Sequence, residues 1–416
     1  MKRLMILLVA CMLLTACTDP TKPTTPTTPH ITNTQPSITQ PDFGAANADD
    51  LKPMPGFDAQ NKYLLQASVG FQEAESFFCG TDIDGNKMQY FDKLSGISGA
   101  LCADPSCTHD TADCGAYIKV GASISYYDGK LYWMKQDAVD SNAFVLWQSD
   151  ISGMNRKKVV RLDYSDVIMK YQPQQYAIHR GKLYMMGMAN AVVGTSVGHR
   201  ITLLSTPLDG SGEVTVLYDR AFANGAWPSM RFVGNYIYFA VPYREEGQIF
   251  GWTITRYNQR TGQSEVIYQE SGLPQIPGDT WVTEQGEVYI SAADAERAYV
   301  YMVEEGQRVE VLCWEEKDYN VPDLLDGIAL ITGRSDGIRY LRASTYDGTV
   351  IYDDRMFPEE VPGAEGDLNM DYYYALIGGD RDKIIINIHA EEFGAYMLLL
   401  DLNNNLRPTV LWSNQE

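Results

Sequence analysis

The chain has 416 residues, and its acidic residues exceed its basic ones to give a formal net charge of −21. This balance argues against nucleic acid as a partner and against flat adsorption on anionic lipid. Tyrosine (27) and glycine (35) are frequent, and long helix-forming stretches rich in Ala, Leu, Glu and Lys are absent. The composition therefore favours an all-β protein.

The N-terminus has the pattern of a bacterial lipoprotein signal. Lys2 and Arg3 precede an uncharged, largely apolar run at residues 4–16, which is too short to span a bilayer comfortably. The run ends in Leu14-Thr15-Ala16-Cys17, which resembles the lipobox, in which the cysteine thiol accepts the lipid. We expect a signal peptide at residues 1–16, lipidation of Cys17, and extracytoplasmic anchoring to the outer face of the bacterial cell membrane.

A polar segment follows the lipidated cysteine. Residues 18–42 hold nine threonines and six prolines, with almost no apolar side chains. Such a segment cannot bury a core, and at about 3.1 Å per residue it extends over some 80 Å. We expect a disordered linker at residues 17–60, which would hold a folded domain away from the membrane.

The rest of the chain repeats one hairpin, in which an apolar strand, a turn with glycine and an aromatic-rich strand follow one another. The turn glycines, spaced 52, 53, 52, 41 and 52 residues apart, are Gly129, Gly181, Gly234, Gly286, Gly327 and Gly379. A second hairpin follows each copy, as in Trp147-Gln-Ser-Asp150-Ile-Ser-Gly153. Four strands per unit of 40 to 53 residues are typical of a β-propeller blade.

An earlier unit completes the set, with its first strand expected at residues 64–69 and its second hairpin at residues 88–101. The sequence thus predicts a β-propeller of seven four-stranded blades over residues 61–416, with six or eight blades as the alternatives. A strand from residues 50–66 is a candidate for closing the ring.

The second hairpin resembles those of TolB-like propellers. Over residues 61–416 the chain resembles the uncharacterised cell-surface propeller lipoproteins of Gram-positive bacteria. The resemblance implies the fold and implies no activity, because propellers serve as enzymes and as scaffolds.

The densest group of reactive side chains lies between the first two units, at Cys102, Cys107, His109 and Cys114. The lipoproteins that the chain resembles carry a similar stretch. Three thiolates and one imidazole could hold zinc, the one cofactor that the sequence suggests. An exported chain meets an oxidising compartment, however, so the sequence favours disulfides among these cysteines and Cys79, with three pairings, and leaves free thiols as a third alternative.

The remaining motifs are weaker. Gly194-Thr-Ser196-Val-Gly198 matches a nucleophile elbow but lies between strands, so we expect no catalytic residue. Asp82 begins a stretch that resembles a calcium loop but fits a hairpin turn better, and Cys313 is expected in the core. Some aromatic residues could line a sugar- or peptide-binding face, although in propellers most pack between blades: Trp227, Trp252, Trp281 and Tyr372 to Tyr374.

We therefore expect a monomeric, non-catalytic propeller that binds an unknown protein, peptide or glycan where loops of several blades converge at one face of the ring. One alternative is a surface glycan-active enzyme that uses loop carboxylates as acid and base. Another is a structural component of an envelope complex.

Overall fold

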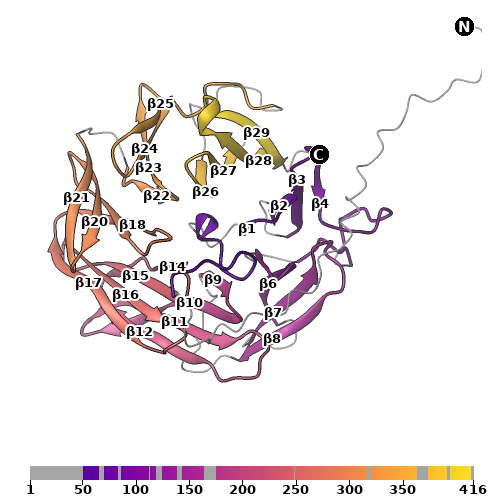
Figure 1. Ribbon diagram of the computed structural model, residues 1–416, viewed down its shortest axis with the longest axis horizontal. Helices are drawn as coiled ribbons and strands as arrows, with labels where there is room; N and C mark the ends of the chain where they lie inside the picture. Colours follow the sequence, from indigo (N-terminus) through magenta and orange to yellow (C-terminus); the bar gives the residue numbers. More distant parts are fainter. Residues whose placement is uncertain are drawn as a thin grey trace, which may run out of the picture.

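The computed structural model describes residues 50–64, 70–82, 86–111, 113–118, 124–137, 143–163, 175–247, 249–315, 320–362, 373–390 and 394–413. These residues form a ring of seven antiparallel sheets around a central channel (Figure 1). The expected signal peptide, the expected lipidation site Cys17 and residues 17–49 of the expected linker lie outside the described residues.

Each sheet is one blade, made of strands that follow one another in sequence. Blades 1 to 3 comprise β1 (Phe71–Glu73), β2 (Phe77–Thr81), β3 (Met88–Asp92) and β4 (Ser98–Ala100); β5 (Ile124–Tyr127), β6 (Lys130–Gln136), β7 (Ala143–Asp150) and β8 (Lys157–Asp163); and β9 (Gln175–His179), β10 (Lys182–Val193), β11 (Ser196–Pro207) and β12 (Thr215–Phe222).

Blade 4 carries one short extra strand, β13 (Gly225–Ala226), which pairs with β15 as β14 does. Blades 4 to 7 further comprise β14 (Ser229–Val233), β15 (Tyr236–Arg244), β16 (Phe250–Asn258) and β17 (Ser264–Leu273); β18 (Ile276–Val282), β19 (Val288–Ala293), β20 (Ala298–Glu304) and β21 (Gln307–Trp314); β22 (Asp323–Leu325), β23 (Ile328–Ser335), β24 (Ile338–Thr345) and β25 (Val350–Arg355); and β26 (Tyr373–Gly379), β27 (Lys383–Ala390), β28 (Gly394–Asp401) and β29 (Arg407–Ser413).

The prediction of an all-β propeller with seven four-stranded blades is confirmed. The prediction was based on the turn glycine of the first hairpin, and the backbone shows why glycine is needed there. Gly181, for example, has a φ of 77°, in the left-handed region where a side chain is disfavoured. Of the first strand expected at residues 64–69, only Leu64 lies among the described residues. The inner strand of blade 1 begins at Phe71, whereas Leu64 follows the short helix η1 (Asn61–Tyr63).

The ring closes by side-chain packing between blades 7 and 1. All four strands of blade 7 come from the C-terminal part of the chain, so the strand considered for closure from residues 50–66 contributes none of them. Trp412 on β29 stacks on Phe71 of β1 with 5.7 Å between ring centroids. Both belong to a buried apolar cluster that also contains Phe78 and Met397. No backbone ladder crosses this seam in the described residues.

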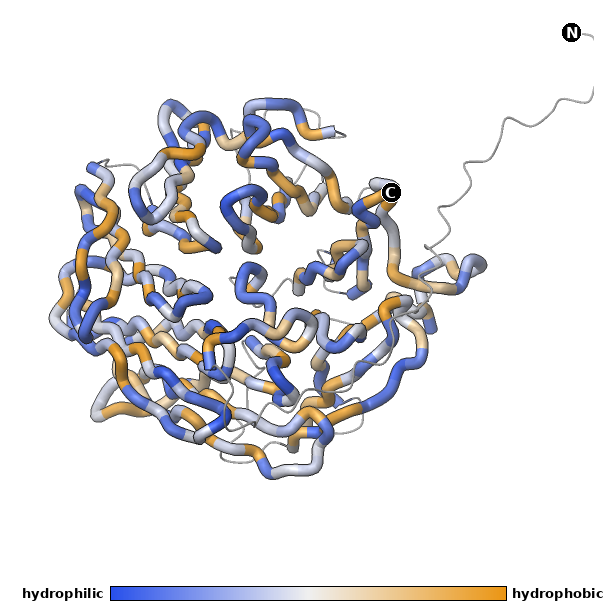
Figure 2. Tube along the Cα trace, viewed as in Figure 1, coloured by the Kyte–Doolittle hydropathy of each residue, from blue (hydrophilic) through white to orange (hydrophobic). Residues whose placement is uncertain are grey.

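Apolar residues fill the spaces between blades, as alternation along half-buried strands requires. Figure 2 shows hydrophobic and hydrophilic stretches alternating along the blades. The helical turns in the described residues are η1 and η2 (Leu402–Asn404). None of the helices in that part of the chain is long or apolar enough to cross a membrane.

Candidate functional site

The N-terminal segment, residues 50–64, occupies the central channel. It enters at the face that carries the first-hairpin turns, here called the turn face, and η1 lies near the middle of the ring (Figure 1). The side chain of Asp50 accepts hydrogen bonds from Arg260 Nε at 2.7 Å and Nη2 at 2.6 Å, and from Asn235 and Asn258. The hydrogen bond from Arg260 is the main reason why the pKa of Asp50 lies far below its usual range.

Blade 3 anchors the next part of the segment through its first turn. The buried Arg180 donates from Nε to Asp58 Oδ1 at 2.6 Å, from Nη2 to the carbonyl of Lys52 at 2.5 Å, and from Nη1 to Asn235 Oδ1 at 2.9 Å. Its own backbone N–H donates to Phe57 O at 2.8 Å. One guanidinium thus joins two parts of the segment to blades 3 and 4, which is the multidentate role that suits arginine.

Two adjacent amide side chains then form hydrogen bonds with backbone groups of two inner strands, on opposite sides of the channel. Gln60 donates to Glu73 O at 2.6 Å and accepts from Glu73 N at 2.8 Å, on β1. Asn61 does the same with Phe232 on β14, at 2.6 and 2.8 Å. The inner strand of a blade presents an unpaired edge to the channel, and these amides pair part of it.

Lys62 and Tyr63 contact blade 1 at the turn end of β1, and only Leu64 reaches the other end of the inner strands. Lys62 Nζ lies 2.6 Å from Glu73 Oε2, and the Tyr63 hydroxyl donates to the same oxygen at 2.8 Å. Burial opposes ionisation of Glu73, but hydrogen bonds from Lys62 and Lys93 prevail and lower its pKa to about 2. The carbonyl of Leu64 accepts from Gln175 at the first residue of β9, away from the turn face. The chain therefore threads its own channel from one face to the other.

A pocket of about 250 Å³ lies at this second mouth, on what we call the pocket face. Its lining is mainly apolar and comes from the N-terminal segment and from blades 3, 4 and 5: Leu64, Gln175, Met186, Met188, Ala226, Trp227, Pro228, Ser229, Arg231 and Asp279. The side chain of Trp227 is 52% exposed, which is unusual for so large an aromatic residue.

A buried ion pair lies at the polar side of this pocket. Arg231 Nη2 donates to Asp279 Oδ1 at 3.0 Å, and the same carboxylate accepts from the backbone N–H groups of Thr280 and Leu324. Arg231 is almost fully buried, yet its Nε has no hydrogen-bond partner among the described residues. Burial raises the pKa of Asp279 despite the opposing charge of Arg231, and burial with the nearby Asp279 charge raises that of Asp323 to about 7.

A second, smaller pocket of about 180 Å³ opens at the turn face. The N-terminal segment forms much of its wall, through Leu51, Asp58 and Lys62 among others. Glu284 and Asp326 face it from blades 5 and 6. Burial and the neighbouring Asp380 charge raise the pKa of Asp326. This end of the channel is therefore narrowed by the chain itself.

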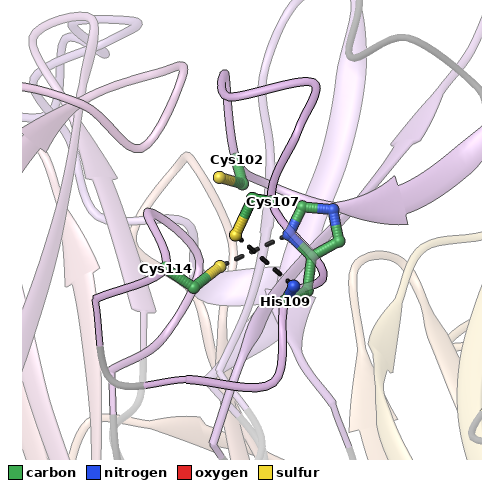
Figure 3. Close-up of side chains that lie close together, drawn as sticks. All are labelled: Cys102, Cys107, His109 and Cys114. Carbon is green, nitrogen blue, oxygen red and sulfur yellow. Dashed lines mark hydrogen bonds between the residues drawn. The ribbon is translucent and has the colours of Figure 1, made fainter.

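The structure brings together the four cluster residues that the sequence singled out. Cys102, Cys107, His109 and Cys114 lie in the connection between β4 and β5, and their ligand atoms all lie within 4.8 Å of one another (Figure 3). His109 Nδ1 is 3.4 Å from Cys114 Sγ. Cys79, the fourth cysteine of the expected disulfide set, is buried on β2 and is not a member of this group.

Other sequence interpretations have mixed outcomes. Trp252 and Trp281 are buried, whereas Trp227 is exposed; Tyr372 lies outside the described residues. Asp82 accepts hydrogen bonds from the backbone of Asn86 and Lys87, as a hairpin turn requires. Ser196 begins strand β11 beside a two-residue turn, with no helix after it.

The expectation of a core position for Cys313 was wrong. This thiol is exposed, because β21 is the outermost strand of its blade and neighbouring sheets cover it only in part. The channel-filling role of residues 50–60 was missed as well, since the sequence placed them in the linker. The adjacent amides Gln60 and Asn61 were a sign in the sequence that this segment forms hydrogen bonds. The sequence around them, however, does not identify backbone partners as far away as residue 232.

No protein-family model matches the sequence, and no curated protein matches it either. Among solved structures, a puromycin hydrolase matches with a TM-score of 0.52 and 12% identity, over 88% of this chain and 57% of its own. A prolyl endopeptidase structure gives 0.50 and 12%, over 85% and 50%. The propeller domain of the Trilobed protease from Pyrococcus furiosus gives 0.49 and 13%, over 84% and 99%.

This chain thus spans about half the length of the puromycin hydrolase and the prolyl endopeptidase, 57% and 50%. Identities this low show the fold and no activity. The chain is a seven-bladed β-propeller whose architecture is similar to that of peptidase propeller domains.

Proposed function

We propose that the protein is a lipid-anchored, extracytoplasmic binding module that holds an apolar peptide segment of another protein in the pocket beside Trp227, without catalysis. The observation that carries the proposal is the asymmetry of the channel. Its own N-terminal segment narrows the turn face, while the pocket face keeps an apolar pocket with an exposed tryptophan.

The lining chemistry supports a peptide. Met186, Met188 and Leu64 give an adaptable apolar wall, and thioethers suit side chains of varied shape. Trp227 offers the kind of large, half-exposed ring that often dominates binding energy. The unpartnered Nε of Arg231 supplies a buried donor that matches a peptide carbonyl. A sugar would need more polar groups than this wall presents.

The path of the chain also supports the pocket face as the binding face. Residue 50 lies at the turn face, so the preceding residues join the ring there. With lipid on Cys17, the tether would join the ring at the turn face and leave the pocket face without an attachment. A linker of this composition spans tens of ångströms, which places the pocket within reach of partners outside the bilayer.

The way in which the pocket carboxylate is held supports the non-catalytic part of the proposal over a glycan-active enzyme. Among the pocket-lining residues, Asp279 is the single carboxylate, and Arg231 and two backbone N–H groups already bind it. Hydrolysis of a glycosidic bond ordinarily requires a pair of carboxylates across the substrate. Asp279 is therefore assigned to positioning Arg231.

The test is selection of random peptides on the immobilised full chain, followed by titration of a selected peptide against variants. We expect Trp227→Ala to weaken binding about tenfold or more, a loss of about 1.4 kcal/mol. Leu94→Ala, at an exposed residue of blade 1, is the matched control and should leave affinity unchanged. Cleavage of the peptide, selective binding of glycans on an array, or equal affinity of both variants would overturn the proposal.

Anchoring is tested separately in cells. Growth with an alkyne-bearing palmitate should label the protein and place it in the membrane fraction. Cys17→Ala should abolish the label and release the chain, whereas Cys313→Ala should change neither. Labelling that survives loss of Cys17 would contradict the lipid attachment.

A further inference from the structure

We propose that Cys102, Cys107, His109 and Cys114 bind one structural zinc ion that fastens the connection between blades 1 and 2. The four donor atoms lie within 4.8 Å of one another. A tetrahedral zinc site with Zn–S bonds of about 2.3 Å has sulfur atoms about 3.8 Å apart. The side chains therefore need to move only slightly to enclose an ion.

The donors converge from a short stretch of irregular backbone. Figure 3 shows the three sulfur atoms and the imidazole converging inside the loop, with Nδ1 of His109 directed at Cys114. His109 has a φ of 62°, a left-handed conformation that costs a histidine energy and persists where surrounding contacts enforce it. Coordination of Nδ1 would be such a contact.

Backbone groups already support the sulfur atoms. The N–H of His109 donates to Cys107 Sγ at 3.4 Å, and the N–H of Ala116 donates to Cys114 Sγ at 3.2 Å. Arg156, from the β7–β8 turn of blade 2, donates to the carbonyls of Gly115 and Tyr117 and so holds the same loop. Such outer contacts fix ligand orientation in metal sites and stabilise thiolate charge.

The loop has only a small apolar core of its own. Its small buried cluster consists of Cys102, Cys114 and Ala116, with Cys107 and Tyr117 beside it, so the ligands are most of its core. Blade 1 is also weak, because β1 and β4 have three residues each and the blade adjoins the seam with blade 7. A bound ion would stabilise the ring where its hydrogen-bonded sheet is smallest.

A disulfide accounts for fewer of these features. One bond between two of the three thiols leaves a thiol and the imidazole without a role, and Cys79 is not in the group. Zinc uses all four donors and leaves no open position, which indicates a structural rather than a catalytic ion. Its binding transfers no electrons; each thiol that ligates as a thiolate releases its proton to water.

The test measures zinc and thiol content in the full chain purified without added reductant. We expect about one zinc ion per chain and no mass deficit from a disulfide. Cobalt exchanged for zinc should give the intense absorption of thiolate–cobalt bonds, which needs no variant. Cys107→Ser and His109→Ala should lower the metal content to near zero, while Cys313→Ser, an exposed thiol outside the group, should keep it.

A chain without zinc whose mass is lower by the two hydrogens of a disulfide would overturn the proposal. So would a metal-free chain in which Cys102, Cys107 and Cys114 react as free thiols, or cobalt binding without the thiolate bands. Peptide binding at Trp227 is independent of this outcome, because that pocket is lined by blades 3 to 5.

Discussion

The backbone N–H of Ala59 donates a hydrogen bond to Nδ1 of His179 at 3.1 Å. This contact fixes the neutral imidazole with its proton on Nε2, which lies 2.8 Å from the carbonyl of Gly234 and donates to it. His179 is fully buried. It therefore links the N-terminal segment, its own blade 3 and the first turn of blade 4.

Stability should fall on mild acidification because of His179. Burial lowers the pKa of His179 to about 4, and the Asp58 charge offsets only part of that effect. The unfolded chain takes up this proton below about pH 6.5, whereas the folded chain resists until about pH 4, so stability is lost between these values by up to about 3 kcal/mol. Urea unfolding at a series of pH values measures it.

The matched control for this effect is the exposed His389. His389→Gln should keep the loss between pH 6.5 and 4, and His179→Gln should remove it. Identical pH profiles for the two variants would contradict the assignment.

Asp323 should have the opposite pH dependence. Its pKa is raised to about 7 by burial and by the Asp279 charge, so the folded chain binds a proton that the unfolded chain lacks above about pH 4. Stability from this group is present at low pH and is lost as pH rises through 7. Asp323→Asn should therefore stabilise the fold at pH 8 by about 1–3 kcal/mol relative to its effect at pH 5. Thermal unfolding at both values checks this, and a pH-independent effect would count against it.

The side-chain amide of Gln60 should contribute more to the stability of the fold than the amide of an exposed glutamine does. Gln60→Ala leaves the N–H and C=O of Glu73 without their partners on the channel edge, which costs about 1–3 kcal/mol. Gln307→Ala, at an exposed glutamine of β21, should cost less than about 0.5 kcal/mol. Urea unfolding of both variants tests the difference. Equal, small effects would show that the segment does not depend on this pairing.

The seam between blades 7 and 1 should be the sensitive point of the ring. Trp412→Ala removes the ring that stacks on Phe71 and should cost about 3–5 kcal/mol. Gly80→Ala should also destabilise, because its Cβ would lie 2.8 Å from Trp412 and 2.7 Å from Gly70 O. Limited proteolysis of these variants should cut blades 1 and 7 first. First cuts in blades 3 to 5 would contradict closure by this packing.

Much of the fold could be predicted because its signals are local. Turn glycines such as Gly181 and Gly234 recur at a nearly constant spacing, and a left-handed turn excludes most other residues. This signal is missing from the first hairpin of blade 1, because the turn between β1 and β2, Ala74 to Ser76, holds no glycine. Strand β1 is only three residues long, so the pattern there is weak.

The candidate sites could be predicted only where their members are close in sequence. The cysteine cluster spans residues 102–114, and its spacing is visible without a structure. The pocket beside Trp227 joins Leu64 to Asp279, and the channel segment joins Asp50 to Arg260. Such pairs depend on how blades close into a ring, and no local pattern in the sequence carries that information.

The most direct test of the central claim is the hydrogen-exchange footprint of a selected peptide on the full chain. If the pocket face is the binding face, exchange should slow at residues 186–188 and 226–231, with the first-hairpin turns near Gly234 and Gly286 unchanged. Protection at those turns, or release of residues 50–64 from the channel on binding, would contradict the account.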